Sequence, residues 1–322
     1  MPEGPTTKIG VIGAGHVGAT FAYALLRSGL AAEIVLIDAD RARAEGEAMD
    51  LQHAAPFERP TRVRAGDWAD LADSAVVVLA AGAGQRPGQS RLDLARRNAA
   101  VARDVAGRVA AAAPAAILLI ATNPVDVLTY VALTSSGLPP ARVLGSGTLL
   151  DTARFRALLA EHFAVDPRSV HAFVIGEHGD SEVPVWSLAN IAGMRLREYC
   201  AAYGEPYPQT AMDKLFARTR DAAYQIIERK GATYYAIASG LVRIVEAIVR
   251  DQATVLSVSS LVNGAYGIGD VCISLPAVVG RNGIERVLPL VLDPVELAGL
   301  HRSAVIVRQA LDDLAQSEPV LP

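Results

Sequence analysis

The sequence predicts an α/β protein in which the N-terminal half forms a doubly wound parallel sheet and the C-terminal half forms an α+β domain. In the first half, continuous apolar runs alternate with Ala-rich amphipathic segments, a pattern typical of parallel strands covered by helices on both faces. After about residue 146 the pattern changes to closely spaced β runs and long helices. A chain of 322 residues is also long for one core. We therefore expect domains at residues 1–146 and 147–322.

The first half supplies the expected parallel strands in order. Each strand is a continuous apolar run, because both of its faces are covered. Gly29 is suited to end the first helix, since glycine adopts the left-handed conformation common at that position. The expected strands are Lys8–Gly13, Glu33–Asp38, Ala75–Ala80, Ala115–Thr122 and Arg142–Gly145, and the expected helices are His16–Ser28 and about Asp93–Ala113.

The second half contains longer helices and no internal repeat. Helical periodicity and β-branched runs alternate less regularly here, which favours an α+β arrangement. The expected helices are Leu150–Phe163, Ala211–Arg229, Thr233–Arg250 and Pro294–Ala315, and the expected strands are His171–Ile175, Thr254–Leu261 and Val271–Val278.

Composition excludes several classes of function. The net charge is −4 and no block of Lys and Arg stands out, so nucleic acid is not an expected partner. Apolar stretches such as Ala115–Ala121 are too short to span a membrane. Met1–Thr7 does not resemble a signal peptide, and Cys200 and Cys272 are expected to be buried, reduced thiols. We therefore expect a cytoplasmic protein.

The string GAGHVG at residues 13–18 lies between an expected strand and an expected helix, the setting of the dinucleotide-binding Rossmann motif. Gly13 permits a tight turn, Gly15 lets a pyrophosphate approach the backbone next to Val17, and Gly18 lets the helix pack closely. Asp38 ends the next strand, where a carboxylate accepts hydrogen bonds from a ribose and repels a 2′-phosphate. This predicts NAD as cofactor. The alternatives are a plain structural turn and a solvated carboxylate.

His178 follows an expected strand and is flanked by glycines, which allow an exposed, tightly fixed loop. Its ordinary pKa suits removal of a proton from a hydroxy acid. Asp151 could orient the imidazole, and Arg154, one helical turn later, could bind a substrate carboxylate with two hydrogen bonds. Taken alone, His178 would more often be a structural histidine. That structural interpretation is the one we give to the histidines His16, His53, His162 and His301.

The Gly-rich segment 81–91 follows a strand, at the edge of the sheet where ligands bind in such folds. It predicts a mobile lid, from which Arg91 could polarise a ketone oxygen and exclude water on closure. The alternative is a solvated loop with a surface arginine.

Together these residues point to a family. The sequence resembles the lactate/malate dehydrogenases, and especially their lactate branch, from Lys8 to the last helix. The motifs that carry the resemblance are GAGHVG (13–18), GQRPGQSRLDL (84–94), TNPVD (122–126), GSGTLLDTARFR (145–156), GEHGDSEVPVWS (176–187) and KGATYYAIA (230–238).

The resemblance implies the roles of several residues. It implies that His178, Asp151, Arg154 and Arg91 act in catalysis and substrate binding as described above. It adds Asn123 beside the nicotinamide and the catalytic centre, Thr233 lining the substrate pocket, and Ile237 behind the nicotinamide ring. Asn123 and Thr233 do not stand out from the residues alone.

Gln85 is the position that separates substrates within the family. The resemblance implies that malate dehydrogenases carry an arginine there, which pairs with the second carboxylate of oxaloacetate. A neutral Gln85 would leave that carboxylate unpaired in a dry site, at a cost of several kcal/mol. We therefore expect pyruvate and L-lactate as the substrate pair. A shift of the segment by one residue would instead bring Arg86 to this position, although Pro87–Gly88 favours Gln85.

Arg156 and His171 match positions that form an anion site between subunits in related bacterial enzymes. The resemblance thus implies fructose 1,6-bisphosphate as a possible effector and a homotetramer, in equilibrium with dimers in some cases. The alternative is that Arg156 pairs with a nearby acid and that His171 is a plain strand residue.

Three other functions stay open at this point. The first is a malate or broad-specificity 2-hydroxy acid dehydrogenase, against which Gln85 argues. The second is an NAD-dependent glycosidase, which would need a metal site; Cys200 and Cys272 do not lie in a metal-binding motif, and we expect no metal. The third is a non-catalytic nucleotide-binding paralogue, against which the set of His178, Asp151, Arg154 and Arg91 argues.

Overall fold

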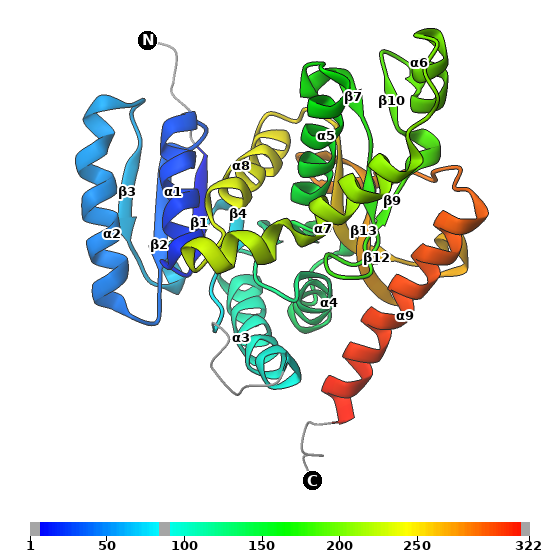
Figure 1. The fold of residues 1–322 in the computed structure, drawn as a ribbon. Coiled ribbons are helices and arrows are strands. Elements are labelled where there is room, and N and C mark those ends of the chain that lie inside the picture. The colour runs from blue at the N-terminus through cyan, green and yellow to red at the C-terminus, as the bar shows by residue number, and fades with distance from the viewer. Residues whose placement is uncertain (1–6, 84–90, 317–322) are drawn as a thin grey trace.

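A computed structural model describes residues 7–83 and 91–316, and for Arg91 it describes the backbone only. The chain forms one large mixed sheet flanked by helices, with two small sheets beside it (Figure 1). The predicted α/β class is confirmed. Within the described residues, no helix has both the length and the apolar character that a membrane crossing requires.

The large sheet has nine strands in the order β14-β13-β12-β6-β5-β4-β1-β2-β3. The strands from β3 to β6 pair in parallel, as predicted for the first half of the chain. β12, β13 and β14 extend the same sheet in antiparallel pairing, so the sheet is mixed. The strands are β1 Lys8–Ile12, β2 Glu33–Ile37, β3 Arg62–Ala65, β4 Ser74–Leu79, β5 Ile117–Ile120, β6 Val143–Gly145, β12 Thr254–Val262, β13 Val271–Gly280 and β14 Gly283–Val287.

The side chains of the central strands alternate between two apolar cores. In β4, Val76 and Val78 face one core, whereas Val77 and Leu79 face the other. The first core includes apolar side chains of α1 and α8, and the second includes those of α3, α4 and α9. Continuous apolar runs are therefore required here, because every position of β4 except the half-buried Ala75 is buried. These helices are α1 His16–Ser28, α3 Arg91–Ala112, α4 Val125–Ser136, α8 Tyr235–Val249 and α9 Pro294–Gln316.

A third apolar core lies beside the large sheet and is centred on Phe155, which is fully buried. It contains side chains from α5, α6 and α7 together with those of three short strands. The Phe155 ring contacts Trp186 edge-on at 4.8 Å between ring centroids. The elements are α5 Leu149–Phe163, α6 Leu196–Ala202, α7 Gln209–Lys230, β7 Val170–His171, β8 Val174–Ile175 and β10 Asn190–Ile191. The exposed strand β11 Met194–Arg195 pairs with β10.

One expected strand is wrong. Residues 171–175 do not form a single strand; β7 ends at His171, and a separate strand, β8 (Val174–Ile175), follows. β7 pairs with β10, whereas β8 pairs with β9 (Val183–Pro184). Between them, the carbonyl oxygen of Ala172 accepts a hydrogen bond from Arg156 Nε at 2.9 Å, so a side chain takes the place of a strand partner.

The sequence interpretation also missed α2 (Arg41–Ala54), along with α4, α6, β3 and β14. α2 lacks a broad apolar face, because its buried residues are only Ala44, Ala48 and Leu51. Its start is fixed locally, since the Asp40 side chain accepts a hydrogen bond from the backbone nitrogen of Arg43.

Two glycines give a matched test of this packing. Gly107 lies on the exposed side of α3, and a Cβ there would meet no atom within 4 Å. Gly107→Ala should raise the free energy of unfolding by about 0.5–1 kcal/mol, because alanine is the better helix former. Gly145→Ala should lower it, since the added carbon would overlap the Thr129 hydroxyl. Urea unfolding measures both changes, and a destabilised Gly107→Ala variant would contradict this account.

Candidate active site

The loop between β1 and α1 is shaped by two glycines that the fold itself requires. Gly13 has a φ of 102°, and a Cβ there would overlap the backbone of Ala81 at the end of β4. A Cβ on Gly18 would overlap the carbonyl oxygen of Gly13. By contrast, a Cβ on Gly15 would lie in open space, with no described atom within 4 Å. The loop therefore leaves room beside Gly15 for a group that is not part of the described chain.

The positive end of the α1 dipole borders this space. Gly15 is the N-cap of α1 and provides no side-chain hydrogen bond to the first turn. Free amides at a helix N-terminus bind anions such as a pyrophosphate. Asp38, just after β2, accepts hydrogen bonds from the backbone nitrogens of Ala14 at 2.6 Å and Asp40 at 2.9 Å. These contacts hold the Asp38 carboxylate against the glycine loop, where the sequence predicts a ribose.

Three further predicted residues lie on α1 or at the start of α8. Val17 and Ile237 are half-buried and pack against the core that includes α1 and α8. Thr233 is half-buried just before α8. The structure thus places Ile237 and Thr233 on or next to α8, which packs on α1.

Asn123 lies between β5 and α4 and is exposed, and a buried asparagine that the sequence interpretation missed fixes its backbone. The Asn98 side-chain nitrogen donates to the Asn123 carbonyl at 2.8 Å, and its oxygen accepts from the backbone nitrogen of Ala83 at 2.8 Å. Asn98 therefore ties together the chain segments that follow β4 and β5. A lone asparagine in a helix carries no sequence signal for this role.

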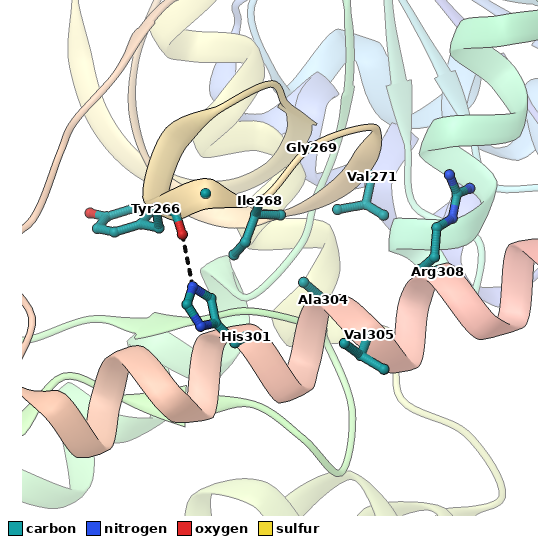
Figure 2. A pocket seen from close by; sticks show the side chains of 9 residues that line it. Tyr266, Ile268, Gly269, Val271, His301, Ala304, Val305 and Arg308 are labelled. Atoms are coloured by element: carbon teal, nitrogen blue, oxygen red, sulfur yellow. Dashed lines mark hydrogen bonds between the residues drawn. The ribbon is translucent and has the colours of Figure 1, made fainter.

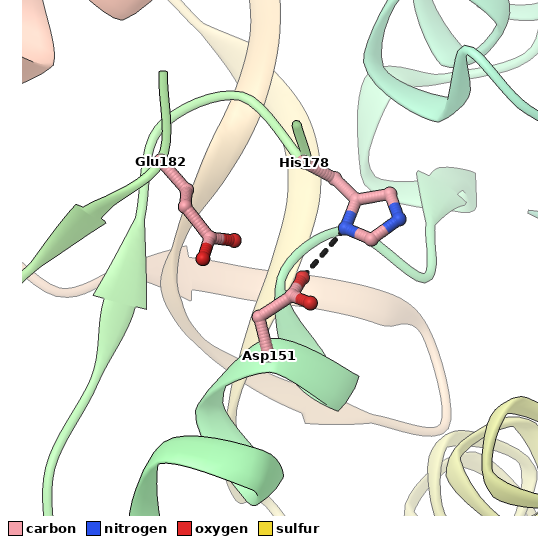
Figure 3. A group of neighbouring side chains, drawn as sticks. All are labelled: Asp151, His178 and Glu182. Carbon is pink, nitrogen blue, oxygen red and sulfur yellow. Dashed lines mark hydrogen bonds and ion pairs between the residues drawn. The ribbon is translucent and has the colours of Figure 1, made fainter. Parts of the chain in front are cut away.

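His178, Asp151 and Arg154 come together as predicted, with the Asp151 carboxylate between the two bases. Asp151 Oδ2 lies 2.5 Å from His178 Nδ1, and Asp151 Oδ1 accepts a hydrogen bond from Arg154 Nη1 at 2.8 Å (Figure 3). Asp151 and Arg154 share one face in the first turns of α5. The Asp151 side chain is only 3% exposed, whereas that of His178 is 23% exposed. The Nε2 edge of the imidazole is thus the one left for a substrate.

The charges of this group shift its pKa values strongly. Burial on its own lowers the pKa of His178, but the charge and hydrogen bond of Asp151, with Asp126 and Glu182, outweigh it and raise the pKa to about 9. Burial likewise raises the pKa of Asp151, but His178 and then Arg154 outweigh it, and that pKa is lowered. The protonated imidazole and ionised carboxylate are therefore the stable pair at neutral pH.

The backbone that carries His178 is also fixed by a buried acid. Asp126, in the first turn of α4, accepts a hydrogen bond from the His178 backbone nitrogen at 2.7 Å. Burial of Asp126 raises its pKa to about 6. In the sequence, Asp126 stands out only as part of the TNPVD string.

Side chains of α9 form hydrogen bonds with both ends of the segment that contains His178. Ser303 Oγ accepts a hydrogen bond from the backbone nitrogen of Glu177 at 2.5 Å. At the other end, Glu296 accepts hydrogen bonds from the backbone nitrogen of Ser187 at 2.8 Å and from its hydroxyl at 2.7 Å. Ser303 and Glu296 are both buried. These contacts have no signal in the sequence, because they join residues more than a hundred positions apart.

Other predicted residues lie in different settings. Gln85, with Arg86 and Pro87–Gly88, lies outside the described residues, and the Arg91 side chain does as well. Arg156 is half-buried, with its guanidinium 5.3 Å from the Phe173 ring centroid, and His171 is exposed. Burial lowers the pKa of Arg156.

The histidines interpreted as structural include two with clear contacts. His16 stacks on Tyr234 at 5.2 Å between ring centroids. His301, on α9, lies in the wall of a small surface cavity, where its Nε2 is 2.8 Å from the carbonyl oxygen of Tyr266 (Figure 2). This cavity is mostly apolar, with Ile268 and Val271 among its lining residues, and His178 is not one of them. Both cysteines are buried and free, as expected.

Comparison with known proteins matches the whole described chain. A family model described as the lactate/malate dehydrogenase NAD binding domain matches residues 7–145. A second, described as the lactate/malate dehydrogenase alpha/beta C-terminal domain, matches residues 148–318. The chain is 49% identical over 307 residues to the L-lactate dehydrogenase of Thermoanaerobacter pseudethanolicus, which covers 95% of this chain and 99% of that relative. It is 52% identical over 314 residues to the L-lactate dehydrogenase of Gloeobacter violaceus, and this match covers 98% of this chain and 95% of that relative.

Solved structures agree with the sequence comparison. A lactate dehydrogenase from a Medee basin deep-sea metagenome library matches with a TM-score of 0.93 and 42% identity, over 97% of this chain and 99% of that one. The minor L-lactate dehydrogenase of Enterococcus mundtii, in a ligand-bound form, matches with a TM-score of 0.92 and 41% identity. This match covers 95% of this chain and 98% of that one. The fold and the sequence therefore point to the same family.

Asp151→Asn should lower the pKa of His178 from about 9 toward or below its ordinary value of about 6.5, because burial then faces less opposition. The raised pKa stabilises the folded state fully below pH 6.5, and this contribution is lost as pH rises through 9. NMR titration of the imidazole measures the shift. Asp104→Asn, at an exposed acid on α3, is the control and should leave the pKa in place. An unchanged pKa in Asp151→Asn would refute the coupling.

Proposed function

The chain belongs to the lactate/malate dehydrogenase family, and we propose that it is an NAD-dependent L-lactate dehydrogenase, which interconverts L-lactate and pyruvate. The observation that carries this proposal is the His178–Asp151–Arg154 group. It combines an acid/base, the carboxylate that orients it and a cation for the substrate carboxylate. Relatives about half identical over nearly the full length, named L-lactate dehydrogenase, support it.

The glycine loop fits a dinucleotide. The open space beside Gly15 and the uncapped N-terminus of α1 suit a pyrophosphate, and Asp38 suits an adenosine ribose without a 2′-phosphate. In this proposal Gly13, Gly15, Val17, Gly18 and Asp38 hold NAD. When bound, NAD supplies the hydride acceptor for lactate oxidation, and its reduced form supplies the donor for pyruvate reduction.

Beside the nicotinamide we place Asn123, Thr233 and Ile237, with Thr233 toward the substrate. Ile237 lies in the core shared with Val17, which supports a position next to the dinucleotide. Asn123 supports the same placement, because its backbone is held at the sheet edge by Asn98. Residues 1–146 would then form the cofactor domain and residues 147–322 the substrate domain.

His178 moves the proton in this mechanism. Asp151 accepts the Nδ1–H, which fixes the tautomer and leaves Nε2 to face the substrate oxygen. In lactate oxidation the neutral imidazole takes the hydroxyl proton, and in pyruvate reduction the imidazolium returns it to the oxygen. The pKa of about 9 makes the imidazolium the resting form at neutral pH, and this is the form that ketone reduction requires.

Arginines position the substrate. Arg154 lies on the same helix as Asp151 and pairs with it, so its guanidinium is part of the site. Its side chain is 14% exposed. A planar guanidinium holds a carboxylate through two hydrogen bonds and so fixes its orientation. Arg91, at the start of α3, is proposed to polarise the ketone oxygen when segment 81–91 closes as a lid.

Substrate choice is proposed to depend on Gln85. Wild type should reduce pyruvate with NADH in preference to oxaloacetate, and without an added divalent metal, which also tests the glycosidase alternative. Gln85→Arg should move the preference toward oxaloacetate by about 2–4 kcal/mol in transition-state terms, because it pairs the second carboxylate. Values of kcat/KM for both keto acids measure this.

Arg86→Gln is the matched control for this test, since it should leave the preference for pyruvate in place. A preference of the wild type for oxaloacetate would overturn the lactate assignment and favour a malate dehydrogenase. A lack of turnover with any 2-keto acid would favour the non-catalytic alternative.

The proposal extends to assembly and regulation. We propose a cytoplasmic homotetramer, in which Arg156 and His171 of adjoining subunits bind a doubly phosphorylated sugar such as fructose 1,6-bisphosphate. The exposure of His171 supports this, whereas the contacts of Arg156 with Ala172 and Phe173 support a structural role.

The effector hypothesis predicts that fructose 1,6-bisphosphate lowers the KM for pyruvate by roughly five-fold or more, a typical coupling between sites. Arg156→Gln should abolish this response. Arg168→Gln should retain it, because Arg168 is a solvent-exposed cation bound to Asp166. An unchanged KM and an unchanged oligomer in the presence of the sugar bisphosphate would remove the hypothesis.

A further inference from the structure

A second buried acid lies beside the Asp151–His178 pair. Glu182 follows His178 by four positions, just before β9, and is only 7% exposed. A carboxylate oxygen of Glu182, a carboxylate oxygen of Asp151 and a ring nitrogen of His178 all lie within 4.8 Å of one another. Figure 3 shows the Glu182 carboxyl on one side of the Asp151 carboxyl and the imidazole on the other. Two buried carboxyl groups thus lie close to one half-buried imidazole.

Glu182 differs from Asp151 in its hydrogen bonding. Asp151 receives hydrogen bonds from two bases, whereas Oε1 of Glu182 is buried and has no partner among the residues that the structure describes. A buried carboxylate without donors is costly to ionise. Burial and the negative charge of Asp151 raise the pKa of Glu182 to about 8.

Positively charged groups around Glu182 lower its pKa. His178 from the same segment, Arg154 from α5 and Arg220 from α7 all lower the pKa of Glu182, but less than burial and Asp151 raise it. The buried Asp126 of α4, which accepts a hydrogen bond from the His178 backbone nitrogen, also favours the protonated imidazole. Glu182 is therefore neutral near pH 7 and becomes charged on the alkaline side, close to the range in which His178 loses its proton.

We propose that Glu182 is a positioning residue whose negative charge keeps His178 protonated at alkaline pH, and that it thereby extends the pH range of ketone reduction. At neutral pH only Asp151 carries charge next to the imidazole. As pH rises, Glu182 releases its proton to solvent, and the new negative charge stabilises the protonated form of His178. This inference rests on the proposed function, because it concerns the acid/base assigned there.

The charge of Glu182 can be removed with little change in shape by Glu182→Gln. In this variant the alkaline pKa in the pH profile of kcat/KM for pyruvate should fall by about half to one pH unit, the size expected for one nearby charge. The loss of activity relative to wild type should therefore grow as pH rises. Glu182→Asp, which keeps the charge, should recover part of the shift.

Glu177→Gln is the matched control. Glu177 lies in the same segment, but its carboxylate accepts a hydrogen bond from the Ser181 hydroxyl. Its neutralisation should move the alkaline pKa by less than Glu182→Gln does. Equal shifts in the two variants would mean that any charge in the segment acts alike, and would overturn the assignment to Glu182.

A second measurement does not need turnover. Diethyl pyrocarbonate acylates neutral imidazole, so the pH dependence of modification of the peptide that contains His178, followed by mass spectrometry, reports its pKa. The half-point should lie lower in Glu182→Gln than in wild type. Equal half-points would overturn the proposal. Failure of the wild type to reduce pyruvate would instead count against the proposed function, which keeps the two failures distinct.

Discussion

The arrangement around the buried carboxylate of Asp151 determines what this protein can do. A carboxylate that is 3% exposed is costly unless its charge is matched, and here two bases on opposite oxygens match it. These contacts also fix the orientation of the His178 and Arg154 side chains. Arg154 shares the helix with Asp151, so this half of the arrangement forms as α5 forms. His178 reaches the carboxylate from another segment, so its half depends on tertiary structure.

The rest of the fold places that second segment. The His178 backbone nitrogen is held by Asp126 of α4, and the neighbouring Glu177 nitrogen by Ser303 of α9. Because α4 and α9 pack in the same apolar core against the large sheet, these polar contacts are anchored by hydrophobic burial. The imidazole is therefore positioned without using its own Nε2 edge, which stays available for chemistry.

The parts of this structure that the sequence predicts are those that depend on local pattern. Apolar runs predicted the parallel strands except β3, whose sequence RVRA is not an apolar run, and the spacing from Asp151 to Arg154 predicted their common helix face. Polar residues that act across the fold gave no such signal. Asn98, Ser303 and Glu296 are ordinary helix residues in sequence, and their roles arise only when distant segments pack together. α2 was missed for a related reason, since its few buried side chains leave little periodicity to detect.

The glycine loop shows how a motif mixes structural and functional constraints. Gly13 and Gly18 are required by the fold, since a side chain at either would collide with backbone whether or not a ligand binds. These two glycines therefore say little about a cofactor. Gly15 is different, because a Cβ there would meet no atom of residues 7–83 or 91–316 within 4 Å, and packing within these ranges therefore gives no reason to keep glycine. The functional content of the motif thus lies in the one glycine that the fold does not need, together with the Asp38 carboxylate held against the same loop.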